Sequence, residues 1–328
     1  MKIIVLTPVK NEEWILDRYL TACSLFADHI IIADQNSTDK SAQIAGKYEK
    51  VILIKNESTS FNEADRQRML INKARELFGT GHFLLGLDAD EIITADSLGA
   101  PGWKTIEESA PGTVFHFERP TLFFDPEQSI RYYKGFPMGY KDDGVEHKPT
   151  AIHSTRIPTP EYAKHVFLED IKFLHLCLVR KNVTFSKLRY YCMLENVKNV
   201  NSLRVRRKIY TKYKPADCVD GDLENTNPLW IKGYDEKGVN LSTFKQDTYN
   251  WTDFEALRIF NEYGTARFFN DSIWHFDWEA CRIAALERGE KNIPQKPLQT
   301  PGKLRVAFVD MFFQTLKGVV KIKNKLFK

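Results

Sequence analysis

The first hundred residues alternate short apolar runs with amphipathic stretches, and this alternation constrains the fold more than any other feature. Buried strands are predicted at residues 2–7, 29–34, 51–55 and 83–87, and helices at 12–26, 39–48 and 62–78. Strands separated by helices of this length pair in parallel through right-handed crossovers. The sequence therefore predicts an α/β fold with a mostly parallel sheet and helices on both faces.

The pattern after residue 95 is mixed, with strand-like runs up to His175 and helical spacing from Thr184 onward. We predict a first domain at 1–215, with one half at about 1–95 and a second at about 96–215. A helical or irregular extension is expected at 216–300, and a basic amphipathic helix at 301–328.

Composition excludes several classes of protein. No window approaches the roughly 18 uninterrupted apolar residues of a membrane-spanning helix, and no tract repeats. The five cysteines are scattered without a C-x-x-C pair, so neither a zinc site nor a redox motif is indicated. We expect a cytoplasmic protein.

The net charge of +4 conceals two basic segments. Residues 172–214 carry twelve Lys or Arg against the single acid Glu195, and residues 301–328 carry seven against Asp310. Such segments indicate phosphate groups or an anionic surface as partners. Nucleic acid is not expected, because no recognised nucleic-acid module accompanies the charge.

Polar residues follow the predicted strands, where ligands bind in an open parallel sheet. Asp88 and Asp90 come directly after the apolar run 83–87. Two carboxylates there cannot be buried without partners, and a divalent cation, Mg²⁺ or Mn²⁺, resolves the conflict while bridging to substrate phosphates. A solvated acidic loop is the alternative. Asp34 ends the second strand, where its carboxylate can accept hydrogen bonds from a nucleobase or a ribose.

Three segments together, T7-P-V-K-N-E-E13, I31-I-A-D-Q-N-S-T-D39 and L84-L-G-L-D-A-D-E91, resemble the sequential signatures of family 2 glycosyltransferases with the GT-A fold. The resemblance covers residues 1–95 well and 96–215 by general pattern. It implies that 1–215 is a catalytic domain, with a nucleotide half at about 1–95 and an acceptor half at about 96–215. It implies a nucleotide-sugar donor, usually UDP-linked, a divalent metal, and inversion at the anomeric carbon.

The resemblance also implies site residues. The first loop would surround the nucleotide, Asp34 would meet the base, Asp88 the ribose and Asp90 the metal. The donor-binding set is then Thr7, Pro8, Val9, Asn11, Glu12, Asp34, Asn36 and Asp88, together with Arg66 or Arg68 from the following helix for the diphosphate.

His175 lies in an apolar run where a lone histidine is commonly a core residue. Because GT-A enzymes use a histidine from this region on the metal, we expect Asp90, Asp88 and His175 as metal ligands, with His153 as a second candidate histidine. Glu169 and Asp170 resemble the acidic pair that carries the catalytic base, and we predict Asp170 as that base. Asp142 and Asp143 are the rival pair, and either pair can equally be a surface turn.

The last helix places apolar residues on one broad stripe from Leu304 to Phe327, with Lys317, Lys321 and Lys325 in a row. Such a helix can lie on an anionic membrane surface, which would make the protein peripheral at the inner face of the membrane. Docking on protein is the alternative.

We therefore predict a metal-dependent glycosyltransferase that moves a sugar from a UDP-sugar to a glycan or lipid-linked acceptor, in the manner of cell envelope polysaccharide biosynthesis. The rivals are a nucleotidyltransferase-like enzyme and a non-catalytic sugar- or membrane-binding protein. A dehydrogenase is disfavoured, because the first strand is not followed by G-x-G-x-x-G.

Overall fold

The computed structural model describes residues 1–57, 63–132, 134–148, 154–219 and 221–326, without the side chains of Asp125 and of residues 317–326. The chain forms two compact units. The sheet unit comprises Met1–Val179 and Asp220–Lys245, and the helical unit comprises Arg180–Val219 and Gln246–Lys328. The predicted domain limits at residues 215 and 300 stay predictions.

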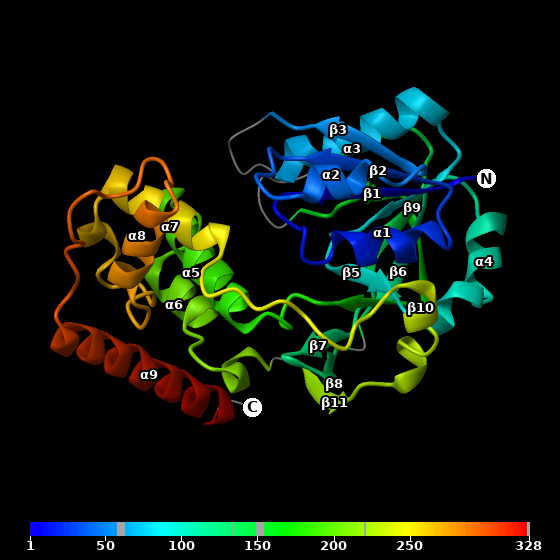
Figure 1. The fold of residues 1–328 in the computed structure, drawn as a ribbon. Helices are drawn as coiled ribbons and strands as arrows, with labels where there is room; N and C mark the ends of the chain where they lie inside the picture. The colour runs from blue at the N-terminus through cyan, green and yellow to red at the C-terminus, as the bar shows by residue number, and fades with distance from the viewer. Residues whose placement is uncertain (58–62, 133, 149–153, 220, 327–328) are drawn as a thin grey trace. The chain divides into compact units, whose positions relative to one another are not determined.

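The sheet unit carries the strands and the first four α-helices (Figure 1). Its strands are β1 (Ile3–Val9), β2 (His29–Asp34), β3 (Val51–Lys55), β4 (Phe83–Gly86), β5 (Glu91–Ile93), β6 (Thr113–Glu118), β7 (Thr121–Phe123), β8 (Asp125–Arg131), β9 (Phe136–Lys141), β10 (Lys164–His175) and β11 (Asp222–Asn225). Its helices are α1 (Leu16–Ser24), α2 (Ser41–Ala45), α3 (Glu63–Phe78) and α4 (Gly102–Glu108), with 3₁₀ turns η1 (Ala95–Gly99), η3 (Pro228–Trp230) and η4 (Asp235–Lys237).

The strands form one sheet in the order β11-β8-β7-β10-β6-β9-β4-β1-β2-β3, and β5 pairs with β10. The run β4-β1-β2-β3 is entirely parallel, as predicted for the nucleotide half. Beyond it, β9 lies antiparallel between β4 and β6, and β6 and β10 are parallel. The predicted α/β class is confirmed, and its parallel pairing is continuous in the first four strands.

Side chains of β1 alternate between two apolar layers, as the period of a buried strand requires. Val5 and Val9 pack into the large cluster that contains α1, whereas Ile4 and Leu6 pack against α3. Figure 1 shows these helices against the parallel part of the sheet. The helices predicted on both faces are therefore confirmed.

β10 changes partners along its length. Its first half runs parallel to β6 as far as Leu168, its register shifts before Lys172, and its end pairs with β5 and β7. Residues 169–171 occupy this irregularity. Because of this shift, the first half of β10 lies beside β6, and its end lies beside β5, which follows the loop after β4.

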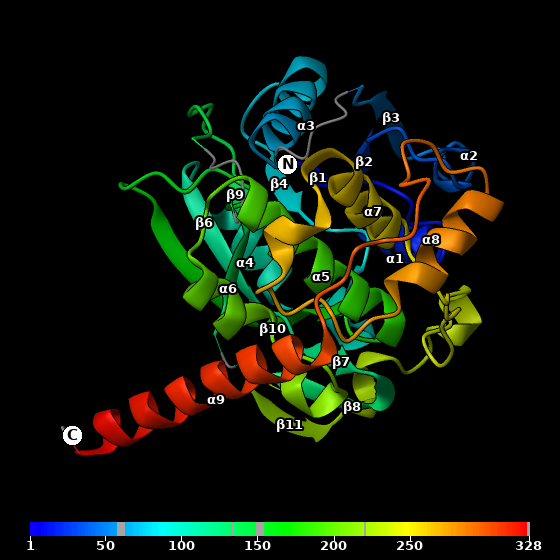
Figure 2. The same cartoon turned by 90° about the vertical axis from the view of Figure 1, so that its left-hand side faces the viewer.

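The helical unit contains α5 (Lys181–Val197), α6 (Leu203–Tyr210), α7 (Trp251–Tyr263), α8 (Trp278–Glu287) and α9 (Lys303–Leu326), with 3₁₀ turns η2 (Pro215–Cys218) and η5 (Thr265–Phe268). Its core is aromatic, with Phe260, Phe268 and Trp278 among the buried residues. Asn250 caps α7 in a capping box with Asp253. Figure 2 shows α9 as one uninterrupted helix.

Two arginines of the basic segment 172–214 have acidic partners inside the helical unit. Arg206 pairs with Asp271 at 2.9 Å, and Arg207 pairs with Asp310 at 2.5 Å. Both arginines are buried. These two cations neutralise acids of the same unit, and a phosphate or anionic-surface partner for the rest of the segment stays a prediction.

Among the described helices, none has the length and apolar content needed to cross a membrane.

Candidate functional site

A cavity of about 460 Å³ opens in the sheet unit beside the carboxyl ends of β1 and β4. Its lining residues are Leu6, Pro8, Glu63, Arg66, Gln67, Leu70, Asp88, Arg119, Phe136, Pro137, Met138, Ser154, Thr155 and Arg156. Three of the predicted site residues, Pro8, Arg66 and Asp88, line it. The cavity therefore lies where ligands bind in an open parallel sheet.

Three guanidinium groups face this cavity, those of Arg66, Arg119 and Arg156. Arg156 donates from Nη2 to Asp88 Oδ2 over 2.6 Å, and its Nη1 pairs with Glu91. Arg119 donates from Nη1 to the other oxygen of Glu91 over 2.7 Å and stacks on the ring of Phe136 at 4.2 Å. The cavity wall thus carries three guanidinium groups and the carboxylates of Asp88 and Glu63, with Glu91 behind Arg119 and Arg156.

Glu91 is the buried carboxylate that holds two of these cations in place. It is 0% exposed. Burial alone raises the pKa of a carboxyl, but the guanidinium groups of Arg156 and Arg119 outweigh it and hold the pKa of Glu91 well below its usual range. Glu91 is therefore ionised and orients both arginines toward the cavity.

Asp90 and His175 come together although they lie far apart in the sequence. Antiparallel pairing of β5 with β10 sets His175 opposite Glu91, and Leu176 N donates to Asp90 O. The Asp90 carboxylate oxygen Oδ1 and His175 Nε2 are 3.9 Å apart. Burial and the neighbouring Arg119 lower the pKa of His175 to about 3, so its imidazole is neutral and can act as a ligand.

The third predicted metal ligand, Asp88, has a different partner in Arg156. Among the residues that the structure describes, no group of three His, Cys, Asp or Glu side chains is arranged to hold a metal ion. A carboxylate beside a neutral imidazole is nevertheless a donor pair that suits Mn²⁺, with substrate phosphate completing the shell. Asp90 and His175 are the pair that could hold a cation. His153 lies outside the described residues.

Asp34 ends β2 next to Val9 of β1 and is 8% exposed. Its Oδ2 accepts a hydrogen bond from Ser37 N over 3.3 Å. Its Oδ1 is buried and has no hydrogen-bond partner within the described part of the chain. A buried carboxylate oxygen without a hydrogen bond costs folding free energy, which a ligand that donates to it would recover.

The loops after β1 and β2 are tied to each other. Asn11 N donates to Ser37 Oγ over 2.9 Å, and Thr38 N donates back to Asn11 Oδ1 over 2.8 Å. Glu12 N donates to Ser41 Oγ over 2.8 Å. Asn11 and Asn36 both have positive φ, of 57° and 48°, which asparagine tolerates better than most residues. The predicted residues Asn11, Glu12 and Asn36 therefore shape this loop pair.

The strand period separates the remaining predicted residues of β1. Thr7 is fully buried, and its Oγ1 shares a hydrogen bond with the hydroxyl of Tyr19 on α1. Val9 is buried on the same face. Pro8 points to the other face and lines the cavity.

Arg66 and Arg68 on α3 have different surroundings. Arg66 lines the cavity. The Arg68 side chain is 46% exposed and lies 3.7 Å from Asp65 on the same helix. Only Arg66 of this pair is therefore placed beside Asp88.

Glu169 and Asp170 lie in the irregular part of β10, and neither lines the cavity. Asp170 Oδ2 accepts a hydrogen bond from Gly102 N, the first residue of α4, over 2.7 Å. The carboxylate thus caps a helix end. The catalytic role predicted for this pair stays a prediction.

The rival pair lies at the amino end of β4, at the other end of that strand from Asp88. Asp142 N donates to His82 O at the start of β4, and Asp142 is fully buried against Arg75 with an Nη2–Oδ1 distance of 2.7 Å. Asp143 accepts hydrogen bonds from Tyr140 and Tyr162. This pair has structural partners far along β4 from Asp88.

Sequence reasoning missed Glu91, Arg119 and Arg156 as site residues. Arg119 comes directly after a strand, so the rule that identified Asp34 and Asp88 could have found it. Arg156 lies in an irregular segment and carries no local signal. It reaches the site because Gly86 has no side chain beneath it: a Cβ at Gly86 would lie 2.7 Å from Arg156 Cβ.

Comparison with known families gives one match. Residues 4–108 match the family described as "Glycosyl transferase family 2". The matched segment contains all three motifs and extends to the end of α4. This confirms the predicted family resemblance over the first third of the chain. A search of curated proteins found no match.

Several solved structures are similar to this chain. Glucosyl-3-phosphoglycerate synthase from Mycobacterium tuberculosis, crystallised with Mn²⁺, UDP and glucosyl-3-phosphoglycerate, is 20% identical with a TM-score of 0.22, over 28% of this chain and 34% of that one. A glycosyltransferase involved in glycosylation of the major capsid of PBCV-1 is 14% identical with a TM-score of 0.30, over 53% and 93%. The structure of 4-diphosphocytidyl-2C-methyl-D-erythritol synthase is 13% identical with a TM-score of 0.29, over 43% of this chain and 75% of that one.

Proposed function

We propose, from the premise that residues 4–108 form a family 2 glycosyltransferase domain, that the protein transfers a sugar from a nucleotide-sugar to a glycan or lipid-linked acceptor. UDP-sugars are the favoured donors. The observation that carries the proposal is the cavity beside β1 and β4, where Asp88 stands among three arginines. A diphosphate is the part of such a donor that this wall would recognise.

The donor would be held by charge at one end and by hydrogen bonds at the other. Arg66, Arg119 and Arg156 supply cations for the diphosphate oxygens. Asp34 Oδ1, buried without a hydrogen-bond partner in the described residues, would accept from the base or the ribose. Asp88 would meet the ribose.

Asp90 and His175 would hold a divalent cation, Mn²⁺ or Mg²⁺. The bound cation would offset the negative charge on the leaving diphosphate. Around it, Arg119 and Arg156 would act on the same charge from fixed positions, because Glu91 already orients them and no reorganisation is needed during the reaction.

Transfer is proposed to invert the anomeric carbon. The acceptor hydroxyl oxygen would bond to that carbon as the bond to the donor phosphate oxygen breaks, the electron pair would leave with the nucleoside diphosphate, and a carboxylate would take the hydroxyl proton. Asp170 or Glu169 remains the predicted base.

A donor screen tests the proposal. UDP and GDP release from their sugar conjugates would be followed with Mn²⁺, with Mg²⁺ and with chelator. We expect release of nucleoside diphosphate that depends on the metal. Pyrophosphate release from a nucleoside triphosphate would instead support the nucleotidyltransferase rival. Absence of any turnover, with sugar binding intact, would support the non-catalytic rival.

We also propose that α9 lies on an anionic membrane surface. Its described apolar residues form an exposed stripe: Leu304, Phe308, Met311 and Phe312 are 89%, 63%, 59% and 51% exposed. The lysine row of the sequence analysis begins at Lys317, where the described side chains end. An apolar stripe with flanking bases is the pattern of helices that bind in the membrane interface. A cytoplasmic location stays a prediction.

Vesicle sedimentation tests the role of α9. The full chain should bind phosphatidylglycerol vesicles, bind phosphatidylcholine vesicles less, and dissociate as salt is raised. Phe308→Ser should weaken binding, whereas Leu229→Ser, which changes a similarly exposed apolar residue of the sheet unit, should not. Equal effects of the two substitutions would contradict the proposal.

A further inference from the structure

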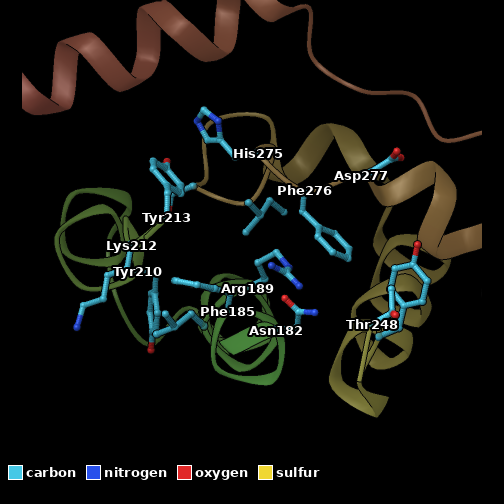
Figure 3. A pocket seen from close by; sticks show the side chains of 14 residues that line it. Asn182, Phe185, Arg189, Tyr210, Lys212, Tyr213, Thr248, His275, Phe276 and Asp277 are labelled. Carbon is cyan, nitrogen blue, oxygen red and sulfur yellow. The ribbon is translucent and has the colours of Figure 1, made fainter. Parts of the chain in front are cut away.

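A second cavity lies within the helical unit and takes no part in the proposed donor site (Figure 3). Its volume of about 380 Å³ is typical of small-molecule pockets, which span about 300–1,000 Å³. Four segments line it: the start of α5, the end of α6 with the residues after it, the residues before α7, and the loop before α8.

Aromatic side chains form much of the lining, among them Phe185, Tyr210, Tyr213, Tyr249 and Phe276. Tyr249 and Phe276 meet edge to face, with ring centroids 6.2 Å apart and planes at 84°. An aromatic ring presents a flat apolar face with negative charge density. The C–H face of a pyranose packs on such a ring, while its hydroxyl groups project sideways and need donors and acceptors.

Two residues that line the cavity have buried polar atoms without hydrogen-bond partners in the described chain. Ser272 is 6% exposed, and its Oγ has no hydrogen-bond partner in the described chain. Arg189 Nε is also buried without a hydrogen-bond partner in the described chain. Figure 3 shows Arg189 gathered with Phe276 and Asn182 at the centre of the pocket. Buried polar atoms of this kind cost free energy that a hydroxylated ligand would recover.

The charged residues that line this cavity differ from those of the cavity in the sheet unit. Arg189 Nη2 donates to Asp253 Oδ1 over 2.7 Å, and its guanidinium carbon lies 3.6 Å from the Phe276 ring centre. His275 Nε2 lies 2.6 Å from Asp310 Oδ2. Arg189 is thus paired with a carboxylate, and Lys212 and Asp277 lie on the same wall, so this lining carries one guanidinium group where the cavity of the sheet unit carries three. A hydroxyl-rich ligand of low charge fits it better.

We propose that the helical unit binds a saccharide in this cavity, as a mono- or disaccharide portion of the acceptor glycan. Aromatic faces pack on the sugar rings, and Ser272 Oγ and Arg189 Nε hydrogen-bond to its hydroxyl groups. Saccharide binding stands on the cavity alone, and its assignment to the acceptor rests on the proposed function.

Saturation-transfer NMR on the full chain tests the proposal with a panel of methyl glycosides of glucose, galactose, mannose, N-acetylglucosamine and glucuronic acid. At least one should bind, with a Kd near or below about 10 mM. Ser272→Ala should raise that Kd about fivefold by removing one hydrogen bond. Tyr249→Leu should raise it about tenfold by removing a ring face. Tyr263→Leu, an exposed tyrosine outside the lining, is the matched control and should change nothing.

Thermal melts show whether each variant, the control included, is folded. No binding by any panel member, or equal binding by wild type and both cavity variants, would overturn the proposal. So would UDP binding that is lost in Tyr249→Leu, because the cavity would then hold a nucleotide. Donor turnover is assayed separately, so its failure removes only the acceptor assignment and leaves the binding result standing.

Discussion

Gly86 and Arg156 pack so closely that a Cβ at Gly86 would lie 2.7 Å from Arg156 Cβ. Real Cβ contacts are not that short, so any side chain at position 86 must displace Arg156. Arg156 bonds to Asp88 and to Glu91, and both carboxylates belong to the motif that follows β4. A glycine in the strand therefore determines where a cation of the cavity wall can stand.

Gly86→Ala should weaken nucleotide binding without unfolding the sheet. Displacing Arg156 removes a charge-assisted contact of about 1.5–3 kcal/mol, so the Kd of UDP should rise about 10- to 100-fold. Calorimetry of UDP binding measures this. Gly99→Ala is the matched control, since nothing lies within 4 Å of its Cβ position. Unchanged affinity in Gly86→Ala would separate Arg156 from the donor.

Asp90→Asn should lower Mn²⁺ affinity at least about tenfold, because an amide oxygen is a weaker ligand than a carboxylate. Electron paramagnetic resonance of free Mn²⁺, with UDP present, measures the bound fraction. Asp96→Asn changes an exposed aspartate a few residues along and should bind Mn²⁺ as wild type does. Equal affinities in the two variants would argue against Asp90 as a ligand.

Glu91→Gln should destabilise the protein by about 3–5 kcal/mol, because two arginines would lose the buried charge that compensates them. Urea unfolding measures the change. Glu108→Gln breaks an exposed pair with Lys104 and should cost less than about 0.5 kcal/mol. A similarly small cost for Glu91→Gln would show that solvent reaches the arginines.

Stability should fall as the pH drops from about 6.5 to about 4, in part because of His147. This residue is 4% exposed, donates from Nε2 to Gln67 Oε1 over 3.3 Å, and has its pKa lowered to about 4 by burial. Above pH 6.5 the imidazole is neutral in both states. Below it the unfolded chain gains a proton that the native state resists, so about 2–3 kcal/mol is lost by pH 4. His147→Gln should flatten that part of the profile from urea titrations, and an unaltered slope would contradict the assignment.

Asp170→Ala should cost about 1 kcal/mol by removing the acceptor for Gly102 N, while Asp170→Asn retains an oxygen and should cost less. Thermal unfolding measures both. The Asn variant also tests catalysis, because an amide cannot take a proton. A fall in kcat of about 100-fold or more in a stable Asp170→Asn protein would support the predicted base, and full turnover would exclude it.

Local periodicity was enough to predict the parallel half of the sheet. Ile4, Leu6 and their neighbours in β2 and β4 form continuous apolar runs, and the helices between them carry apolar residues at helical spacing. Because parallel strands bring their carboxyl ends to the same edge of the sheet, the positions of Asp34 and Asp88 at that edge were predictable too.

The remainder depends on pairings between residues that are distant in the sequence. Arg156 reaches Asp88, and His175 reaches Asp90, only through the register of β10 and the space above Gly86. The sequence shows the charge of Arg207 but not its partner, because Asp310 is distant in the sequence and meets Arg207 only in the folded helical unit. Helix and strand periods carry no information about such contacts.

The mutual hydrogen bonds between the loops after β1 and β2 mean that neither loop is an independent module. Replacing one loop with a counterpart from a relative would leave backbone N–H donors of the other loop without their acceptors. Engineering of nucleotide preference in this protein would therefore succeed only when the two segments are exchanged as a matched pair.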